Sequence, residues 1–394
     1  MTTKFSGREY LDRARTLAPM IQACADDIER DRRLPRSLLT ALIEAGMFRL
    51  LLPRSLGGGE VDPITFVEVM EEIAKVDAST AWCLCQAAGC SMTAAYLPPA
   101  VAQKIFGRDQ EGIVAWGPGP DARAVAADGG YRVTGTWSFA SGSRHATWLG
   151  AHCPVYETDG TLRKRPDGAT EVRTMLFPAS QATLIDVWHV MGLRGTGSDS
   201  FSVSDLFVPR DYSVLRDDPS ERREEGALYC FKSGNLYASG YAGLALGVAR
   251  STLEALIDLA KEKKPRGFAR LLRDNAVVQF QVGQAEAKLR SARAFLMTSL
   301  DEIWDAIGRS GNPTLTLDQR VTIRLAATHA IHQAREIVEV AYNAAGGNAV
   351  FTNNAFERRF RDIHTVTQQL QGRWTHFETV GQFLLGLEPD TTWM

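Results

Sequence analysis

The N-terminal part of the chain carries apolar side chains at the spacing of α-helices. Over residues 10–28 apolar positions recur every three or four residues, and charged residues fill the opposite face. A second helix is predicted over residues 35–46, because its opening proline suits the first helical turn and its closing glycine can end a helix in the left-handed conformation. Asp62 is the predicted N-cap of a third helix, and a fourth begins near Ser79. We therefore predict an all-helical domain over residues 1–111.

The period of the pattern then changes to two. From residue 131 to residue 139 apolar and polar residues alternate after an Asp-Gly-Gly turn, which indicates a strand with one buried face. Similar short runs recur at residues 148–155, 172–177 and 201–208, separated by polar or glycine-containing loops. A compact β domain is therefore predicted over residues 112–215.

Helical periodicity returns in the C-terminal part. It predicts four long helices, over residues 244–264, 276–307, 317–345 and 360–385, that form an antiparallel bundle within a domain spanning 225–394. Some of these helices are apolar on two faces, and a helix of that kind needs a second partner. The pattern thus predicts that subunits associate.

Composition narrows the class of protein. The 394 residues are 45% hydrophobic and 23% charged, with a net charge of -2. That balance is typical of a globular protein and gives no field that would attract nucleic acid or an anionic membrane. No apolar run is long enough for a signal peptide or a membrane span. We expect a cytoplasmic protein that binds small molecules.

The cysteines favour the same compartment. The six cysteines are sparse for this length, and Cys83 and Cys85 stand close together without a histidine at metal-ligand spacing. We expect these thiols to be reduced and buried in a helix, and we predict no metal site.

Several local sequences resemble the acyl-CoA dehydrogenase family, in the same order along the chain. The resemblance covers almost the whole chain and implies a mainly helical fold: an N-terminal helical domain, a middle β-barrel and a C-terminal four-helix bundle. The matching segments are Gly46 to Gly59, Val69 to Ser79, Gly192 to Ser198, Phe207 to Pro209 and Ala345 to Asp362.

Within that family, the sequence Trp-Ser-Phe-Ala-Ser-Gly at residues 137–142 resembles the reduced-flavin-dependent hydroxylases of the two-component, group D branch. The resemblance implies that Phe139 lies against the isoalloxazine ring and that Ser141 hydrogen-bonds near flavin N5. An N5 hydrogen bond can protect a C4a-hydroperoxyflavin, and a dry pocket prolongs its life. A strand serine that serves a backbone group is the alternative. The preceding strand adds Trp116, Gly117 and Pro118 to the implied flavin contacts.

The carboxylate of a dehydrogenase is missing. The family places a glutamate at one of two positions to remove the substrate α-proton, and these fall near Tyr237 and Leu370 here. Dehydrogenation of an acyl-CoA by an FAD-dependent enzyme is therefore the disfavoured alternative. A non-catalytic relative of the same fold is the other.

The general base is also unassigned. Many of the hydroxylases carry a histidine in the last signature, where this chain has Gln369, and a glutamine cannot take a proton at neutral pH. Either another residue, His145, His364 or His376, is the base, or the substrate is an amine or thioether that needs none. A structural role for each histidine remains open.

The flavin phosphate requires positive charge or backbone donors. Lys263 stands where the dehydrogenases have an arginine on the loop after the first bundle helix, and Arg266 is displaced, although a solvated basic loop would look the same. Gly346 and Gly347 belong to the later signature and complete the implied cofactor contacts. A weakly held dinucleotide favours a reduced flavin, FMN in preference to FAD, that arrives from elsewhere.

The residues and the resemblance together predict the oxygenase component of a two-component flavin-dependent monooxygenase. It would use reduced flavin and O2 to oxygenate a small aromatic, amine or sulfur-containing metabolite. Since no GxGxxG motif follows a strand into a helix, electrons must come from a separate NAD(P)H:flavin reductase. The resemblance further implies a homotetramer.

Overall fold

A computed structural model describes residues 7–108, 111–310 and 314–392. Its N-terminal part is helical, as predicted. Asp62 caps the third helix by accepting a hydrogen bond from the Thr65 amide, and Gly46, with φ of 74°, follows the second helix in the left-handed conformation. The fourth helix begins one residue before the predicted Ser79, because Asp77 is its cap. The helices are α1 (Gly7–Asp31), α2 (Arg36–Glu44), α3 (Pro63–Ala74), α4 (Ala78–Ser91) and α5 (Pro99–Phe106).

The middle of the chain forms an 8-stranded sheet in the order β6-β7-β3-β2-β4-β5-β8, with β1 paired in parallel to β4. The long strands β3, β4, β5 and β7 are the four that the alternating pattern predicts. Trp137 and Phe201 stack with ring centroids 5.2 Å apart in the core of this sheet. The strands are β1 (Val114–Gly117), β2 (Arg123–Ala127), β3 (Gly130–Ala140), β4 (Trp148–Tyr156), β5 (Val172–Pro178), β6 (Thr183–Ile185), β7 (Asp199–Pro209) and β8 (Ser213–Val214).

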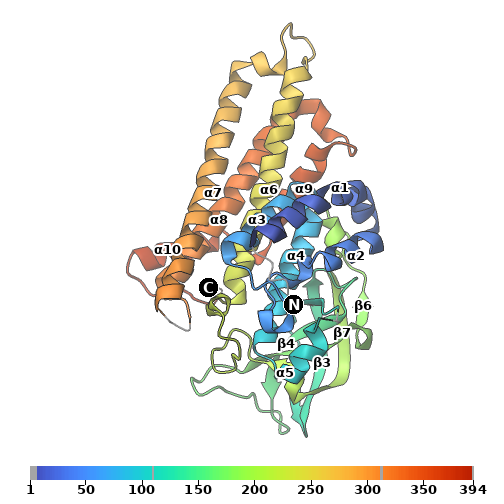
Figure 1. The fold of residues 1–394 in the computed structure, drawn as a ribbon, viewed down its shortest axis with the longest axis vertical. Coiled ribbons are helices and arrows are strands. Elements are labelled where there is room, and N and C mark those ends of the chain that lie inside the picture. The colour runs from blue at the N-terminus through green and yellow to red at the C-terminus, as the bar shows by residue number, and fades with distance from the viewer. Residues whose placement is uncertain (1–6, 109–110, 311–313, 393–394) are drawn as a thin grey trace.

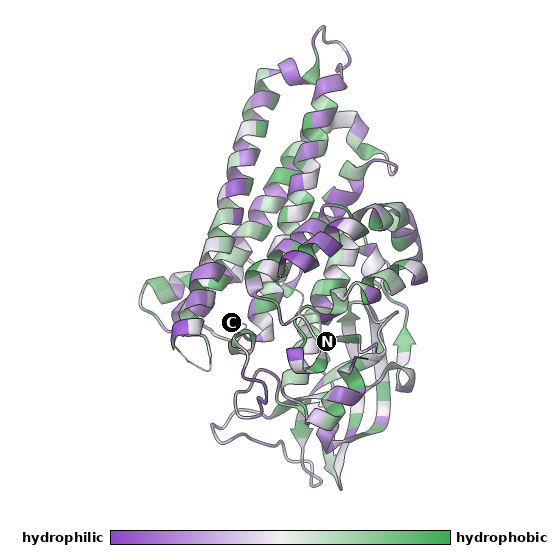
Figure 2. Ribbon diagram, in the orientation of Figure 1, coloured by the Kyte–Doolittle hydropathy of each residue, from purple (hydrophilic) through white to green (hydrophobic). Residues whose placement is uncertain are grey.

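The C-terminal part is a helical bundle that extends away from the sheet (Figure 1). Its long helices α6, α7 and α8 run side by side, and Figure 2 shows hydrophobic and hydrophilic residues alternating along them. The predicted order of a helical domain, a β domain and a helical bundle is thus confirmed. The helices are α6 (Ser233–Glu262), α7 (Ala276–Ser310), α8 (Leu317–Ala345), α9 (Ala355–Thr367) and α10 (Thr375–Leu384).

Two of the predicted bundle helices have different bounds. Helix α6 begins at Ser233 rather than at residue 244, because its first three turns are rich in small residues that are buried against α3 and α4. The predicted helix over residues 360–385 was wrong as a single element. It is divided into α9 and α10 at Gln369, whose extended backbone (ψ 154°) starts a short 3₁₀ turn.

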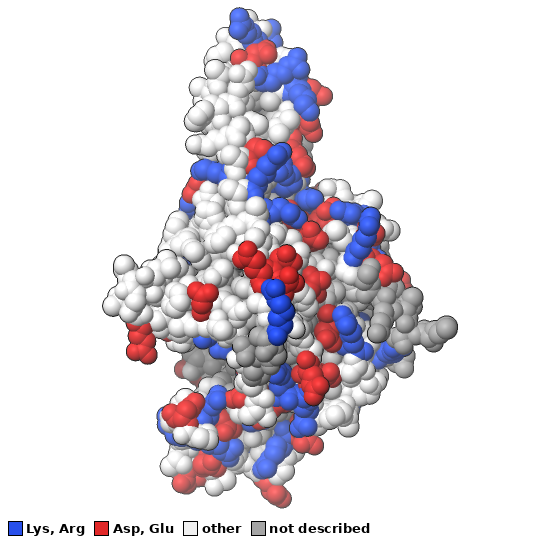
Figure 3. Space-filling view, turned by 60° about the vertical axis from the view of Figure 1, so that its left-hand side comes forward, with Lys and Arg blue, Asp and Glu red and all other residues white. Residues whose placement is uncertain are grey.

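The surface agrees with the small net charge. Figure 3 shows positive and negative side chains interspersed on the face in view, without a field of one sign. Among the described residues, no helix combines the length and apolar character that crossing a membrane requires.

Candidate functional site

Phe139 is the first unusual feature of the sheet. It lies in an irregular stretch of β3 where the pairing with β7 shifts between Trp137 and Ala140. Its φ is 57°, a conformation that costs a bulky residue about 1–3 kcal/mol. Its side chain is 64% exposed although Trp137 and Ala140 are fully buried, and the ring of Trp188 meets it edge-on at 6.1 Å. The sheet therefore presents a bare aromatic ring held in a strained conformation.

Strand β1 lies directly against this irregular stretch. A Cβ on Gly117 would stand 1.8 Å from the carbonyl oxygen of Ser138, so only glycine fits here. The carbonyl of Pro118 accepts a hydrogen bond of 3.0 Å from the Ser138 amide. The structure thus brings the main chain of Gly117 and Pro118 beside Ser138 and Phe139, while a flavin contact at these residues stays a prediction.

The side chain of Trp116 is buried and packs against an imidazole and a guanidinium group. His152 meets its indole at 5.0 Å, and the guanidinium of Arg216 lies 5.3 Å from the ring centroid. The Trp116 side chain therefore has structural partners of its own, and the main chain at Gly117 is what approaches Phe139.

A row of buried hydroxyl groups runs from Ser141 into the loop before β7. Ser141 Oγ lies 2.7 Å from Ser198 Oγ, and Ser198 Oγ lies 2.7 Å from Thr196 Oγ1. Thr196 Oγ1 donates to the Leu193 carbonyl at 2.8 Å. From α4, Trp82 Nε1 donates to Ser141 Oγ at 2.9 Å. Both partners of the Ser141 hydroxyl are side chains, so the alternative of a serine serving a backbone group was wrong.

Aromatic residues of α4 and α6 form a wall next to this row. Trp82 stacks on Tyr241 at 4.1 Å, and Tyr241 stacks on Tyr237 at 5.9 Å. Tyr241 donates to Gln86 Oε1 at 2.8 Å, while the Tyr237 hydroxyl lies 3.5 Å from Cys90 Sγ. Burial raises the pKa values of both tyrosines, so they remain protonated at neutral pH. Tyr237, at one of the two positions of the dehydrogenase glutamate, therefore cannot act as that base.

His145 sits under the site without hydrogen bonds. Both ring nitrogens are buried, and neither has a partner among the residues that the structure describes. Burial lowers its pKa to about 4, so the imidazole is neutral near pH 7. The ring of Phe48 meets it edge-on at 6.0 Å.

The other predicted catalytic residues make their contacts elsewhere. His364, on α9, packs on the ring of Phe360 at 4.4 Å and places Nε2 3.4 Å from Glu339 Oε1. The Gln369 side chain accepts from the Gln371 amide at 2.6 Å and so caps a 3₁₀ turn. Among the described residues, therefore, neither His364 nor Gln369 forms a hydrogen bond with Ser141. His376 is buried against the Leu370 carbonyl, and burial lowers its pKa to about 4.

The predicted phosphate contacts lie apart from Phe139. Lys263 donates from Nζ to the carbonyl of Ala345, beside Gly346 and Gly347, and Arg266 is exposed on the connection between α6 and α7. Figure 1 shows this connection at the end of the bundle farthest from the sheet. One chain therefore holds two separate groups of the predicted cofactor residues.

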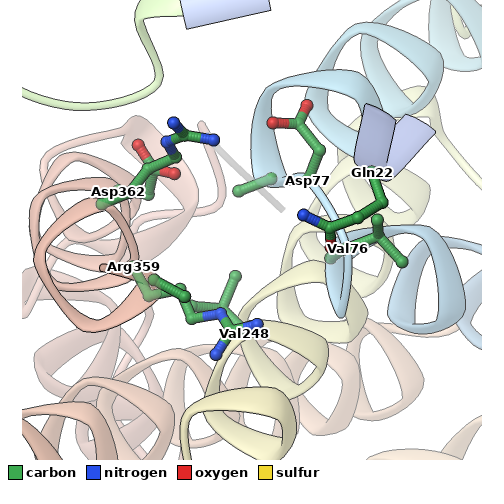
Figure 4. A pocket seen from close by; sticks show the side chains of 10 residues that line it. Gln22, Val76, Asp77, Val248, Arg359 and Asp362 are labelled. Atoms are coloured by element: carbon green, nitrogen blue, oxygen red, sulfur yellow. The ribbon is translucent and has the colours of Figure 1, made fainter. Parts of the chain in front are cut away.

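A small cavity of about 40 Å³ lies behind the loop before β7 (Figure 4). Asp77 and Asp362 line it together with Arg359. Asp362 Oδ1 accepts the Leu193 amide at 2.6 Å, which ties the hydroxyl row to α9. Burial raises the pKa of Asp362 to about 7, and the nearby Asp77 adds to this effect.

Sequence reasoning missed several members of this site. Trp82 and Ser198 are the hydrogen-bond partners of the Ser141 hydroxyl, and Thr196 bonds Ser198 in turn, but none of the three was predicted as a site residue. The segment 192–198 was recognisable only as a family signature. Trp82 offered one signal, because a buried indole N–H needs a hydrogen-bond acceptor, and the helix that carries Trp82 is almost entirely buried.

Two family models match the chain. The model described as "Acyl-CoA dehydrogenase, N-terminal domain" matches residues 8–106, and "Acyl-CoA dehydrogenase, C-terminal domain" matches residues 239–372. Together these ranges cover more than half of the 394 residues.

Curated relatives and solved structures agree with the family models. An indole-3-acetate monooxygenase from Pseudomonas putida is 28% identical over 92% of this chain and 90% of its own length. The oxygenase component of an FADH2-dependent resorcinol hydroxylase from Rhizobium sp. is 26% identical, over 95% of this chain and 93% of its own. The HsaA monooxygenase from M. tuberculosis shares the fold, with a TM-score of 0.88 and 24% identity over 99% of this chain and 100% of that one. The chain belongs to the acyl-CoA dehydrogenase superfamily and, within it, is similar to the flavin-dependent monooxygenases.

Proposed function

We propose that this chain is the oxygenase component of a two-component flavin-dependent monooxygenase. The observation that carries the proposal is the exposed Phe139, strained in its backbone and set beside Gly117 and Ser141. A planar ligand that forms hydrogen bonds needs an aromatic ring to stack on, a main chain that it can approach closely, and a hydroxyl group to bond with. The strained, exposed Phe139, the glycine at 117 and the buried Ser141 supply these three features. The relatives named as flavin-dependent oxygenases, the resorcinol hydroxylase component and HsaA, support this assignment.

The residues present fit an isoalloxazine ring. Phe139 would contact its face, Gly117 would let the main chain approach its edge, and the Ser141 hydroxyl would bond at N5. Reduced flavin supplies the electrons with which O2 is activated. The aromatic wall of Trp82, Tyr237 and Tyr241 excludes water from this side of the site, and a dry site suppresses the loss of activated oxygen as peroxide.

The substrate class follows from the absence of a strong base among these residues. His145 is neutral and a weak base with a pKa of about 4, and the tyrosines hold their protons. A substrate that must be deprotonated by the enzyme fits poorly. The proposal is therefore a small, electron-rich metabolite that is aromatic or carries an amine or sulfur lone pair, and it does not depend on His364 or Gln369.

The flavin would be FMN in preference to FAD and would come from a separate NAD(P)H:flavin reductase. Lys263 and Gly346 lie far along the bundle, so they could reach a flavin bound at Phe139 only from a second subunit. Large apolar side chains on α7 and at the end of α10 are exposed in the single chain, which supports a homotetramer. These are Val277, Phe280, Phe295, Leu384 and Leu385.

The test is rapid mixing of the protein and reduced FMN with O2. We expect a long-lived absorbance species distinct from reduced and oxidised flavin, and NADH oxidation coupled to oxygenation only when a reductase is supplied. Ser141→Ala should shorten that lifetime at least tenfold, since the N5 contact is lost, while Ser143→Ala serves as the matched control because its hydroxyl bonds the Gly197 carbonyl. Tight binding of oxidised FAD with reduction of an acceptor by an acyl-CoA would instead identify a dehydrogenase. Failure to bind any flavin would identify a non-catalytic relative.

A further inference from the structure

The buried hydroxyl row has a fixed end. Thr196 Oγ1 stands 2.8 Å from the carbonyl oxygen of Leu193, which has no proton to give. Thr196 must therefore use its single proton on that carbonyl. Two oxygen atoms at this distance without a proton between them would repel each other.

This end sets the direction of the whole row, because each hydroxyl has one proton. Thr196 has used its own, so in the 2.7 Å contact with Ser198 it accepts and Ser198 donates. Ser198 has then used its proton, so in the next 2.7 Å contact Ser141 donates to it. All three protons are satisfied inside the protein in this direction.

Ser141 is consequently left without a proton to offer. Its hydroxyl proton points to Ser198, and one of its two lone pairs accepts from Trp82 Nε1, an indole group that can only donate. What remains for a ligand is a single acceptor lone pair. The reverse direction would leave the close Thr196–Leu193 contact without a proton and would require an outside acceptor at Ser141.

We infer that Thr196 and Ser198 are positioning residues through which the site selects reduced flavin over oxidised flavin, because they leave Ser141 able only to accept. The inference rests on the proposed contact of Ser141 with N5. In reduced flavin N5 carries a hydrogen and donates to that lone pair. In oxidised flavin N5 is bare, so two lone pairs would face each other. The selection suits an oxygenase that receives reduced flavin and must release the oxidised form.

Loss of either hydroxyl should remove the selection. In Ser198→Ala the Ser141 proton loses its acceptor and turns to the ligand. In Thr196→Val, Ser198 loses its acceptor and donates to Ser141, which then donates outward. Exchanging one favourable hydrogen bond for one unfavourable contact corresponds to about a tenfold change in relative affinity.

The test measures the dissociation constants of oxidised FMN and, without oxygen, of reduced FMN, together with the midpoint potential of bound FMN. In wild type we expect reduced FMN to bind more tightly. Both variants should lower the ratio of the oxidised to the reduced dissociation constant about tenfold, which makes the midpoint potential of bound FMN about 30 mV more negative. Thr196→Ser preserves the row and should keep the wild-type ratio.

The outcomes separate this inference from the proposed function. A merely structural role would weaken both forms equally and leave the potential unchanged, and that result in both variants overturns the inference. If wild type binds reduced FMN and reacts with O2 but the variants keep its ratio, the selection by Thr196 and Ser198 is wrong while the proposed function stands. If wild type binds neither form, both are wrong.

Discussion

As the pH rises from acid to neutral, the wild-type protein should lose stability because the buried Asp362 ionises. Replacing Asp362 with asparagine should remove this pH-dependent loss. Asp362 is buried at the small cavity behind the hydroxyl row, and its Oδ1 accepts the Leu193 amide. Asparagine keeps an acceptor oxygen of the same shape but cannot ionise. The substitution therefore tests the charge and preserves the anchor of the loop.

The magnitude and sign follow from the raised pKa. Burial moves the pKa of Asp362 from 3.8 to about 7. The folded protein thus holds this proton more tightly than the unfolded chain, so the associated stability is full below about pH 4 and is lost as the pH rises through 7. A difference of about three pKa units corresponds to about 4 kcal/mol at most. In the variant this contribution is independent of pH.

Thermal unfolding between pH 4.5 and pH 8 measures the effect. The difference in Tm between Asp362→Asn and wild type should shift in favour of the variant by several degrees over this range. Asp128→Asn, in an exposed turn, should show no such shift. A constant difference between Asp362→Asn and wild type at every pH would refute the buried, proton-holding state of this carboxyl.

Three further predictions concern the flavin contacts and are measured by flavin titration. Gly117→Val should abolish binding, since its Cβ would collide with the Ser138 carbonyl, whereas Gly234→Ala, in open space, should not. Phe139→Ala should weaken FMN binding about tenfold or more without lowering Tm, because the lost ring is exposed in the free protein; unchanged affinity would contradict the stacking contact. Lys263→Ala should weaken FAD more than FMN, and equal effects would argue against a phosphate contact from a second subunit.

The order of the three parts could be predicted because the period of the apolar pattern changes from helical to two at the start of the β domain and returns to helical after it. The alternation from Tyr131 to Trp137 identifies the buried face of β3, and the Asp62 cap marks a helix start by its chemistry. Phe139, the next residue of that alternation, was expected on the buried face and is exposed, because the pairing with β7 shifts after Trp137. The break at Gln369 was not predicted, because the flanking helices share one apolar pattern and the single glycine in the break, Gly372, is tolerated within a helical pattern. Local pattern therefore identifies elements but not where packing interrupts them.

The residues of the candidate site also fall into those that the sequence could predict and those that it could not. Phe139 and Ser141 could be chosen because they lie in one short motif that resembles a family variant. The partners of Ser141 could not, because Trp82 and Ser198 stand 59 and 57 residues away in the chain and meet it only after α4 packs on the sheet. Neither could the strain at Phe139, which depends on the pairing of β3 with β7.

Apart from Asp362, whose pKa is about 7 and which bonds the Leu193 amide behind the hydroxyl row, the polar groups around Ser141 whose pKa is shifted do not change charge near neutral pH. Burial keeps His145 neutral, and it holds the protons on Tyr237, Tyr241 and Cys90. Such a site cannot exchange protons readily with its ligand, so it must act by the fixed directions of its hydrogen bonds. In the described structure those directions are set at the Leu193 carbonyl, which also accepts a hydrogen bond from Trp188 Nε1, and the Trp188 ring meets the ring of Phe139 edge-on. The loop that carries that carbonyl is therefore as much a part of the site as the strand that carries the ring.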